Sequence, residues 1–366
     1  MAKVTDEQRD TTSALPVLGG GDSARRSRPT ARDVAQLARV SQSTVSRVLS
    51  GAGAQFISEA TSQRVHTVAR QLGYSPHPLA RALRGKRTHL IGLIVPEIAD
   101  PFFANFVAVL SSQSRDLGYQ LILGYVHSSP AAALRVTSFL DPRHCDGILL
   151  LGDLCEDRDM TLERLKDSRA VVALCWGHSR NLLPSVNVDN RAGIRLLLDH
   201  LCALGHRRLA FIDGGCRADI LERRGSFLEY AREKRIAIPQ DCVLAEANDL
   251  GGGYRAVQRL LNLSPRPTAI MASDDVVALG AIKAATDAGL RVPQDVSITG
   301  FDDIEQARFS CPSLTTVHQP VQEMGREALQ MLLDLMADRT TPESGPRLVV
   351  QPELFIRQST GPALVD

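Results

Sequence analysis

The sequence predicts a small all-α head followed by a larger α/β body. Three short amphipathic segments, each preceded by a capping residue, lie between positions 30 and 73. From position 89 the pattern changes to buried strand-like runs that alternate with helical segments. Charge separates the two parts as well: nine basic and two acidic residues (+7) lie in 30–89, and 28 basic and 35 acidic residues (−7) lie in 90–366.

The first helix of the head begins after Thr30. Asp33 stands three residues later and completes a capping box with the Thr30 hydroxyl. Val34, Leu37 and Ala38 recur at helical spacing, so we expect all three to point into the core of the head.

The second helix follows after a turn of only a few residues. Ser41 is the next N-cap, and Val45, Val48 and Leu49 form the next apolar stripe. Two short helices joined in this way have the geometry of a helix-turn-helix, whose second helix enters the major groove of DNA. The side chains left outside near its start are polar, and they suit contacts to base edges and phosphates: Gln42, Ser43, Ser46 and Arg47.

A third helix is capped by Ser58 and ends at Gly73, and a short basic helix follows before position 85. The inward positions of the third helix are Val65, Val68, Ala69 and Leu72. The basic charge of the head favours phosphate binding with release of counterions. The alternative is a three-helix cap whose basic face is only solvated.

The body repeats one pattern twice. Buried runs at 90–95, 119–125 and 147–151 predict strands, and 104–118 predicts a helix that ends at Gly118. The pattern returns in strand-like runs at 210–214, 268–273 and 295–301. Parallel sheets covered by helices follow from this alternation, and two such units predict two lobes with a ligand site between the carboxyl ends of their strands.

Composition and motifs exclude several classes of protein. The 366 residues allow two or three domains, and 44% hydrophobic content is ordinary for a globular protein. The chain has no apolar run of the ~18 residues needed to span a membrane and no signal-peptide core, which predicts a cytoplasmic protein. Seven scattered cysteines without a C-x-x-C pair predict neither a disulfide framework nor a metal site.

The segment 33–51 (DVAQLARVSQSTVSRVLSG) resembles the helix-turn-helix signature of the LacI/GalR family of bacterial transcription regulators, and 74–85 (YSPHPLARALRG) resembles the hinge helix of that family. The body is similar to the type I periplasmic-binding-protein-like sugar-binding fold that the family uses as a sensor. Its matching stretches are 188–214, 292–303, 312–320 and 353–360, so the resemblance covers about 29–360.

The resemblance implies a domain plan. A disordered tail at 1–28 precedes the helix-turn-helix domain at 29–75 and the hinge helix at 76–88. An effector-binding and dimerisation domain at 89–360 and a tail at 361–366 follow. The chain would cross between the lobes three times. The N-lobe is expected at 90–201 and 319–345, and the C-lobe at 202–318 and 346–360.

For DNA the resemblance implies that Gln42 and Ser43 read bases in the major groove and that Arg47 supports them. Ala80 and Leu83 would enter the minor groove, where Leu83 would be a wedge that bends the duplex; alternatively, Leu83 packs within the hinge-helix pair. The expected DNA-binding residues are Thr30, Gln42, Ser43, Thr44, Ser46, Arg47, Ala80 and Leu83. Two departures are Arg39, where the family has a glycine with positive φ, and His77, where it has an asparagine.

For the effector the resemblance implies a site of charged and aromatic side chains: Phe102, Phe103, Asp189, Arg223, Leu250, Asp275, Asp302 and Gln319. Asp302 would accept two sugar hydroxyls, whereas Leu250 replaces an aromatic ring that often closes the site. Each assignment has a structural alternative: Asp302 caps a helix, Arg223 is solvated with Arg224 in its place, and the two phenylalanines belong to the core. Asp189 would then hold a turn.

The implied function is that of a repressor, which binds a palindromic operator as a homodimer and is controlled by a small molecule, a sugar or sugar derivative, without a further cofactor. Members of the family also bind nucleobases. Two other readings are a sugar-transport protein with the same body and an α/β enzyme. The basic head argues against the first. The absence of the phosphate-loop, metalloprotease and nucleophile-elbow motifs argues against the second.

Overall fold

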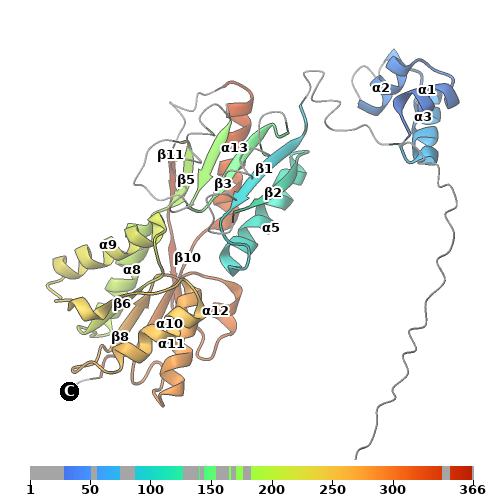
Figure 1. Ribbon diagram of the computed structural model, residues 1–366. Coiled ribbons are helices and arrows are strands. Elements are labelled where there is room, and N and C mark those ends of the chain that lie inside the picture. The colour runs from blue at the N-terminus through green and yellow to red at the C-terminus, as the bar shows by residue number, and fades with distance from the viewer. Residues whose placement is uncertain are drawn as a thin grey trace, which may run out of the picture. The chain divides into compact units, whose positions relative to one another are not determined.

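The chain forms two compact units, which divide between Ala80 and Arg81 in the computed structural model. The first unit is a three-helix head and the second is a body with two sheets (Figure 1). Within the part of the chain that the structure describes, no helix is both long and apolar enough to cross a membrane. The described residues are 29–50, 56–74, 87–126, 140, 144–153, 165, 170–175, 183–339 and 347–364.

The head consists of α1 (Ala31–Leu37), α2 (Gln42–Ser50) and α3 (Glu59–Leu72), as the sequence predicts. The capping box of α1 is formed, with the Thr30 backbone N–H donating to Asp33 Oδ2 at 2.7 Å and the Asp33 N–H donating to Thr30 Oγ1 at 3.4 Å. The three helices enclose one small core, made of Val34, Ala35, Ala38, Val45, Val48, Val65 and Ala69.

The prediction for Leu37 is wrong. Its side chain is 60% exposed, and Ala35 fills the core position beside Val34 and Ala38. In a helix of only seven residues, a narrow stripe of side chains reaches the core. In α1 that stripe contains Val34 and Ala35 and excludes Leu37. Arg39, in the turn to α2, has φ +51°, the left-handed conformation expected for the position at which the family has glycine.

The first sheet of the body is parallel and has the strand order β11-β5-β4-β3-β1-β2. Helices α5 (Pro101–Asp116) and α13 (Val321–Met336) pack together, and α13 also packs on β3, β4 and β5. The strands are β1 (Leu90–Val95), β2 (Gln120–Tyr125), β3 (Gly147–Leu151), β4 (Val171–Leu174), β5 (Ser185–Val188) and β11 (Arg347–Val350).

The second sheet has the order β12-β10-β9-β8-β6-β7 and is parallel except for β12. Its strands are β6 (Leu209–Asp213), β7 (Val243–Ala245), β8 (Ala269–Ala272), β9 (Ser297–Asp302), β10 (Thr315–His318) and β12 (Glu353–Phe355). The helical segments around it are α8 (Asn190–Ala203), α9 (Ala218–Glu233), η3 (Gln240–Cys242), α10 (Leu250–Leu260), α11 (Asp275–Asp287) and α12 (Glu305–Phe309).

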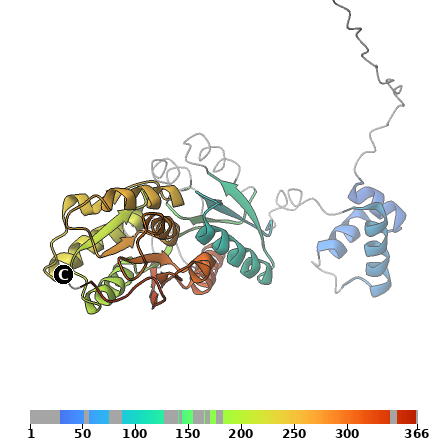
Figure 2. The same cartoon turned by 90° about the horizontal axis from the view of Figure 1, so that it is seen from below.

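The lobe boundaries differ from the expected ones at two places. Helix α8 packs against α9 and β12, so the chain enters the C-lobe near position 189 rather than after 201. Strand β11 pairs with β5, so the N-lobe continues to Val350 and does not end at 345. Helix α13, orange-red in both views, lies with the elements of the first sheet (Figures 1 and 2). The chain therefore crosses back from the C-lobe to the N-lobe after β10.

Candidate nucleic-acid interface and interlobe site

The outer face of α2 carries the predicted base-reading side chains. Gln42, Ser43 and Arg47 are exposed, whereas Val45 and Val48 anchor the opposite face in the core. Short-range contacts fix the first turn of the helix, because Ser41 Oγ accepts the Thr44 N–H at 3.1 Å and lies 2.7 Å from Ser43 Oγ. The start of α2 is therefore a rigid polar surface with an amide and a guanidinium group pointing outward.

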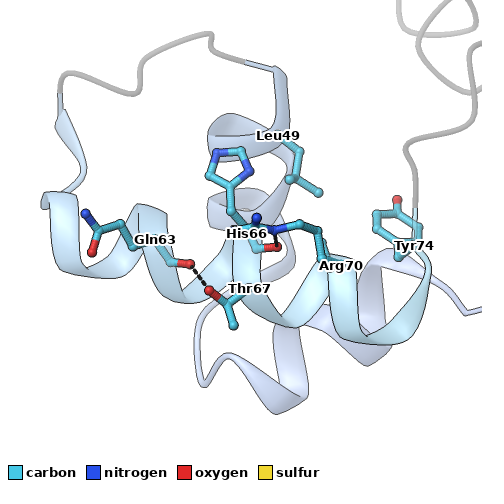
Figure 3. Close-up of a pocket in the computed structure, with 7 residues that line it drawn as sticks. Leu49, Gln63, His66, Thr67, Arg70 and Tyr74 are labelled. Carbon is cyan, nitrogen blue, oxygen red and sulfur yellow. Dashed lines mark hydrogen bonds between the residues drawn. The ribbon is translucent and has the colours of Figure 1, made fainter.

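Helix α3 packs against both helices of the helix-turn-helix. The guanidinium Nε of Arg64 donates to the carbonyl of Ala38 at 2.9 Å and so ties α3 to the end of α1. A hollow lies between α3 and the end of α2 (Figure 3). None of the predicted DNA-binding side chains lines it; its lining is Leu49, Gln63, His66, Thr67, Ala69, Arg70 and Tyr74. The hinge positions Ala80 and Leu83 lie outside the described residues.

The second candidate site, here named the interlobe cluster, lies where the carboxyl ends of the two sheets meet. Asp100 precedes α5 and Asp153 follows β3 in the N-lobe, and Gln319 follows β10 at the crossover. The C-lobe contributes residues that follow its strands or begin α9. The cluster consists of Asp100, Asp153, Arg217, Asp219, Arg223, Asn248, Ser273, Asp274, Asp302 and Gln319.

Arg223 is the centre of the cluster on the C-lobe side. It is only 2% exposed, so the alternative of a solvated helix arginine is excluded. Its Nε donates to Asn190 Oδ1 at 2.8 Å and its Nη1 donates to the Ser273 carbonyl at 2.8 Å. The guanidinium group also lies 3.7 Å from the centroid of the Phe301 ring, a cation–π contact.

Asp302 ends β9 beside this arginine. Its Oδ1 lies 3.3 Å from Arg223 Nη1 and accepts a hydrogen bond from Gln319 Nε2 at 2.6 Å. Burial raises the pKa of this carboxyl well above its usual range, and Arg223 acts in the opposite direction. The backbone of Asp302 has φ +113°, a strained conformation for a non-glycine residue and one that recurs at functional sites.

Arg217 joins the two lobes. Its guanidinium group lies 3.8 Å from Asp100 of the N-lobe and 3.6 Å from Asp274 of the C-lobe, and it faces the Phe103 ring at 5.2 Å. The next residue, Ala218, donates its N–H to Asp153 Oδ2 at 2.9 Å. The amino end of α9 therefore carries direct contacts to Asp100 and Asp153 of the N-lobe.

Two predicted effector residues have structural partners of their own. Asp275 is fully buried, and its oxygens accept hydrogen bonds from the Thr316 hydroxyl at 2.5 Å and the Ile304 N–H at 2.9 Å. Asp189 is the N-cap of α8 and accepts from the Ala192 N–H at 2.9 Å.

The predicted apolar contacts differ in position. Phe102 and Phe103 are both buried, and Phe102 makes edge-to-face contacts with Phe103 and Phe106. Only Phe103 also faces Arg217 and hence the interlobe cluster. Leu250 is 55% exposed at the start of α10, whereas Asn248 is packed against Gly214 together with Ser273. A Cβ atom at position 214 would lie 1.9 Å from Asn248 Oδ1.

Sequence reasoning missed seven residues of the cluster: Asp100, Asp153, Arg217, Asp219, Asn248, Ser273 and Asp274. Each lies a few residues beyond a strand end, and that position was the available signal. Several buried side-chain atoms in the cluster have no hydrogen-bond partner: Arg217 Nε, Asp219 Oδ1, Asn248 Oδ1, Ser273 Oγ, Asp274 Oδ2 and Gln319 Oε1. Because such atoms cost free energy when they stay unpaired, their concentration makes this cluster the candidate ligand site.

Comparison with known proteins gives matches for both units. Residues 30–77 match the model of bacterial regulatory proteins of the lacI family, and residues 198–360 match a periplasmic binding protein-like domain. The chain is 34% identical to the HTH-type transcriptional repressor PurR of Erwinia tasmaniensis over 334 residues, which cover 90% of this chain and 96% of that protein. The PurR repressor of Photorhabdus laumondii is also 34% identical with the same coverage.

Solved structures agree with the fold. A lac repressor dimer bound to operator and the anti-inducer ONPF has a TM-score of 0.82 at 27% identity, with 91% of this chain and 99% of that chain covered. The CelR–cellobiose complex has a TM-score of 0.68 at 30% identity, with 91% and 100% covered. A regulator from Enterococcus faecium with bound ribose has a TM-score of 0.66 at 25% identity, with 75% and 100% covered.

Proposed function

The chain belongs to the lacI family of bacterial regulatory proteins, and on this basis we propose that it binds a nearly palindromic operator as a homodimer under the control of a small molecule. It is a DNA-binding transcriptional repressor of that family and not an enzyme. The operator, the dimer and the effector are the content of the proposal. A cytoplasmic location, where the protein would reach the nucleoid, belongs to it as well.

The polar outer face of α2 is the observation that carries the proposal for DNA. Gln42 and Ser43 would contact base edges, and Arg47 would contact bases or phosphates from one turn later. Thr30, Thr44 and Ser46 would position the head on the backbone, and Ala80 and Leu83 would enter the minor groove. Two heads would read half-sites about 34 Å apart, one turn of the duplex. The lac repressor neighbour is a dimer on its operator, which supports this assembly.

The effector would bind at the interlobe cluster. Phe103, Arg223, Asp302 and Gln319 remain effector contacts in this proposal, and Arg217, Asp219, Asn248 and Asp274 are added to them. Phe102, Asp189 and Asp275 would support the site through packing, capping and hydrogen bonds, and Leu250 would lie at its rim. A sugar suits the cluster because hydroxyl groups donate to carboxylates. Cellobiose and ribose in two structural neighbours are consistent with this class.

Closure of the lobes would transmit the signal. A ligand between Asp100 and Asp153 on one side and the amino end of α9 on the other would change the contacts that now join the lobes. The spacing of the two N-lobes in a dimer would then change, and with it the hinge segments that follow the heads. A coupling of ~1–3 kcal/mol between effector and operator would give a useful switch.

Selection of duplexes from a random DNA library, at roughly physiological salt, tests the DNA part of the proposal, because nonspecific phosphate binding is weakened there. We expect an enriched palindrome with a flexible pyrimidine–purine step at its centre. A double variant, Gln42→Ala with Ser43→Ala, is the matched control and should lose the enrichment while it keeps nonspecific binding. Enrichment that is unchanged in the double variant would contradict the assigned reading helix.

Isothermal titration with a pentose, a hexose, a sugar acid and a purine tests the effector part. We expect one of these classes to bind, and Asp302→Asn to weaken that binding. The same titration with Asp199→Asn, which removes a carboxylate on the outer surface of α8, controls for loss of charge. Equal effects of the two substitutions would contradict an effector site at the interlobe cluster.

A further inference from the structure

The interlobe cluster offers many more acceptors than donors to a ligand. Its unpaired buried atoms include four oxygens that only accept hydrogen bonds, and one nitrogen, Arg217 Nε, that only donates. The Ser273 hydroxyl does either. The four acceptors are Asp219 Oδ1, Asn248 Oδ1, Asp274 Oδ2 and Gln319 Oε1. A ligand that satisfies this set must donate several hydrogen bonds and has little need to accept them.

The same residues carry an excess of negative charge. Among the described residues, four carboxyl groups (Asp100, Asp219, Asp274 and Asp302) face the guanidinium groups of Arg217 and Arg223, which leaves a formal charge of −2. The nearby Asp213 does not change the balance, because Arg224 pairs with it at 2.8 Å. Burial raises the pKa of both Asp100 and Asp302, and the nearby carboxylate of Asp274 raises both further. Repulsion between the carboxylates therefore acts on residues of both lobes.

Arg217 balances this charge only loosely. Its guanidinium group lies between 3.6 and 3.9 Å from the carboxylates of Asp100, Asp219 and Asp274. All three distances exceed the length of a charge-assisted hydrogen bond. The Asp274 side chain is only 1% exposed, yet its Oδ2 has no hydrogen-bond donor. The position beside Asp219 and Asp274 thus has the charge and the open acceptors for a second cation.

Resting on the effector site proposed above, we infer that the effector is a cationic, donor-rich molecule: a polyol or sugar that carries a protonated amine. The ammonium group of this ligand binds beside Asp219 and Asp274, and the hydroxyl groups of the ligand donate hydrogen bonds to Asn248 and Gln319. Anionic ligands such as sugar acids and sugar phosphates are excluded, because they would add negative charge to a buried site that already has too much.

Matched pairs of small molecules test the inference on the full-length protein. Each pair has one carbon skeleton with an ammonium or a hydroxyl group at the same position: glucosamine and glucose, galactosamine and galactose, and glucamine and sorbitol. Glucuronic acid and glucose 6-phosphate represent the anions. Titration calorimetry should show at least one ammonium compound that binds about tenfold or more tightly than its hydroxyl twin, and no binding of either anion at about 10 mM.

Two variants locate the contact. Asp274→Asn removes one charge but keeps the oxygen that caps α11 through the Val277 N–H at 2.9 Å, so the fold is retained. We expect it to weaken binding of the ammonium compound about tenfold or more and binding of the hydroxyl twin much less, so that the preference for the ammonium compound falls. Asp199→Asn removes a charge at the protein surface and should change neither.

Three outcomes would overturn the inference: a hydroxyl twin or an anion that binds as tightly as the ammonium compound, no ammonium compound that binds, or an unchanged preference in Asp274→Asn. Operator binding is measured on the same preparations. Intact operator binding without ammonium selectivity would overturn the inference alone, whereas failure to select any operator would overturn the proposed function.

Discussion

Substitution of Asp275 tests whether its carboxyl group stabilises the fold or contacts the effector. The residue is fully buried, and one oxygen accepts the Thr316 hydroxyl while the other accepts the Ile304 N–H. It thereby ties α11 to β10 and to the turn after β9. Gly300 permits this approach, because a Cβ atom there would lie 2.1 Å from Asp275 Oδ1.

The two available substitutions have different expected costs. Asp275→Ala leaves two buried donors without acceptors, at about 1–3 kcal/mol each, so the free energy of unfolding should fall by roughly 2–6 kcal/mol. Asp275→Asn keeps both contacts, since its Oδ1 accepts from Ile304 while its amide group donates to the Thr316 hydroxyl. Its cost at pH 7 should stay below about 1 kcal/mol.

The pH dependence of stability distinguishes the native protein from Asp275→Asn. Burial raises the pKa of Asp275 well above 3.8 in the folded protein, so the folded state binds this proton more tightly than the unfolded state. The contribution of Asp275 to stability is therefore fully present below pH 3.8 and is lost as the pH rises through the folded pKa. Because asparagine does not titrate, the stability of Asp275→Asn relative to the native protein should increase with pH over this window.

Urea unfolding followed by circular dichroism at several pH values measures these differences in the transition of the body. A loss below about 1 kcal/mol for Asp275→Ala would refute the structural role, because two stranded donors cannot cost so little. Effector affinity, measured by calorimetry, should be unchanged in Asp275→Asn. A loss of affinity without a loss of stability would make Asp275 an effector contact instead.

Three further predictions concern the head and the hinge. Gln42→Ala should cost ~1–3 kcal/mol on the best operator and relax base preference at one position of each half-site, which a panel of single-base operator variants would show. Leu83→Ala should weaken specific binding far more than nonspecific binding in gel-shift titrations, and equal losses would remove the wedge role. Thr30→Ala should destabilise the head by about 1 kcal/mol in hydrogen exchange, because the capping box is lost, whereas Thr30→Ser should retain most of it.

The sequence was most informative where structure depends on neighbours along the chain. The capping box of Thr30 and Asp33 and the strands β1, β2, β3, β6, β8 and β9 were predictable from local rules, and the αL turn at Arg39 followed from the family resemblance. Leu37 was mispredicted because periodicity gives two adjacent helical faces for so short a segment, and only the packing of α3 decides between them.

The site needed information that the sequence does not contain. Arg217 and Asp100 come together only when two separate sheets face each other, and no local pattern predicts that contact. The choice of Asn248 over Leu250 depends on where β7 ends and α10 begins, a shift of two residues. The lobe boundary at α8 likewise depends on its packing against α9, which is a tertiary contact.

Measurement of operator affinity with and without the bound effector tests the central claim most directly. The duplex would be the palindrome obtained by selection, and the ligand would be the compound that calorimetry identifies. We predict that saturating ligand changes the operator Kd by a factor of roughly 5–150, and that operator changes the ligand Kd by the same factor. Tight binding of both, with neither affinity changed by the other, would contradict a repressor controlled through its interlobe cluster.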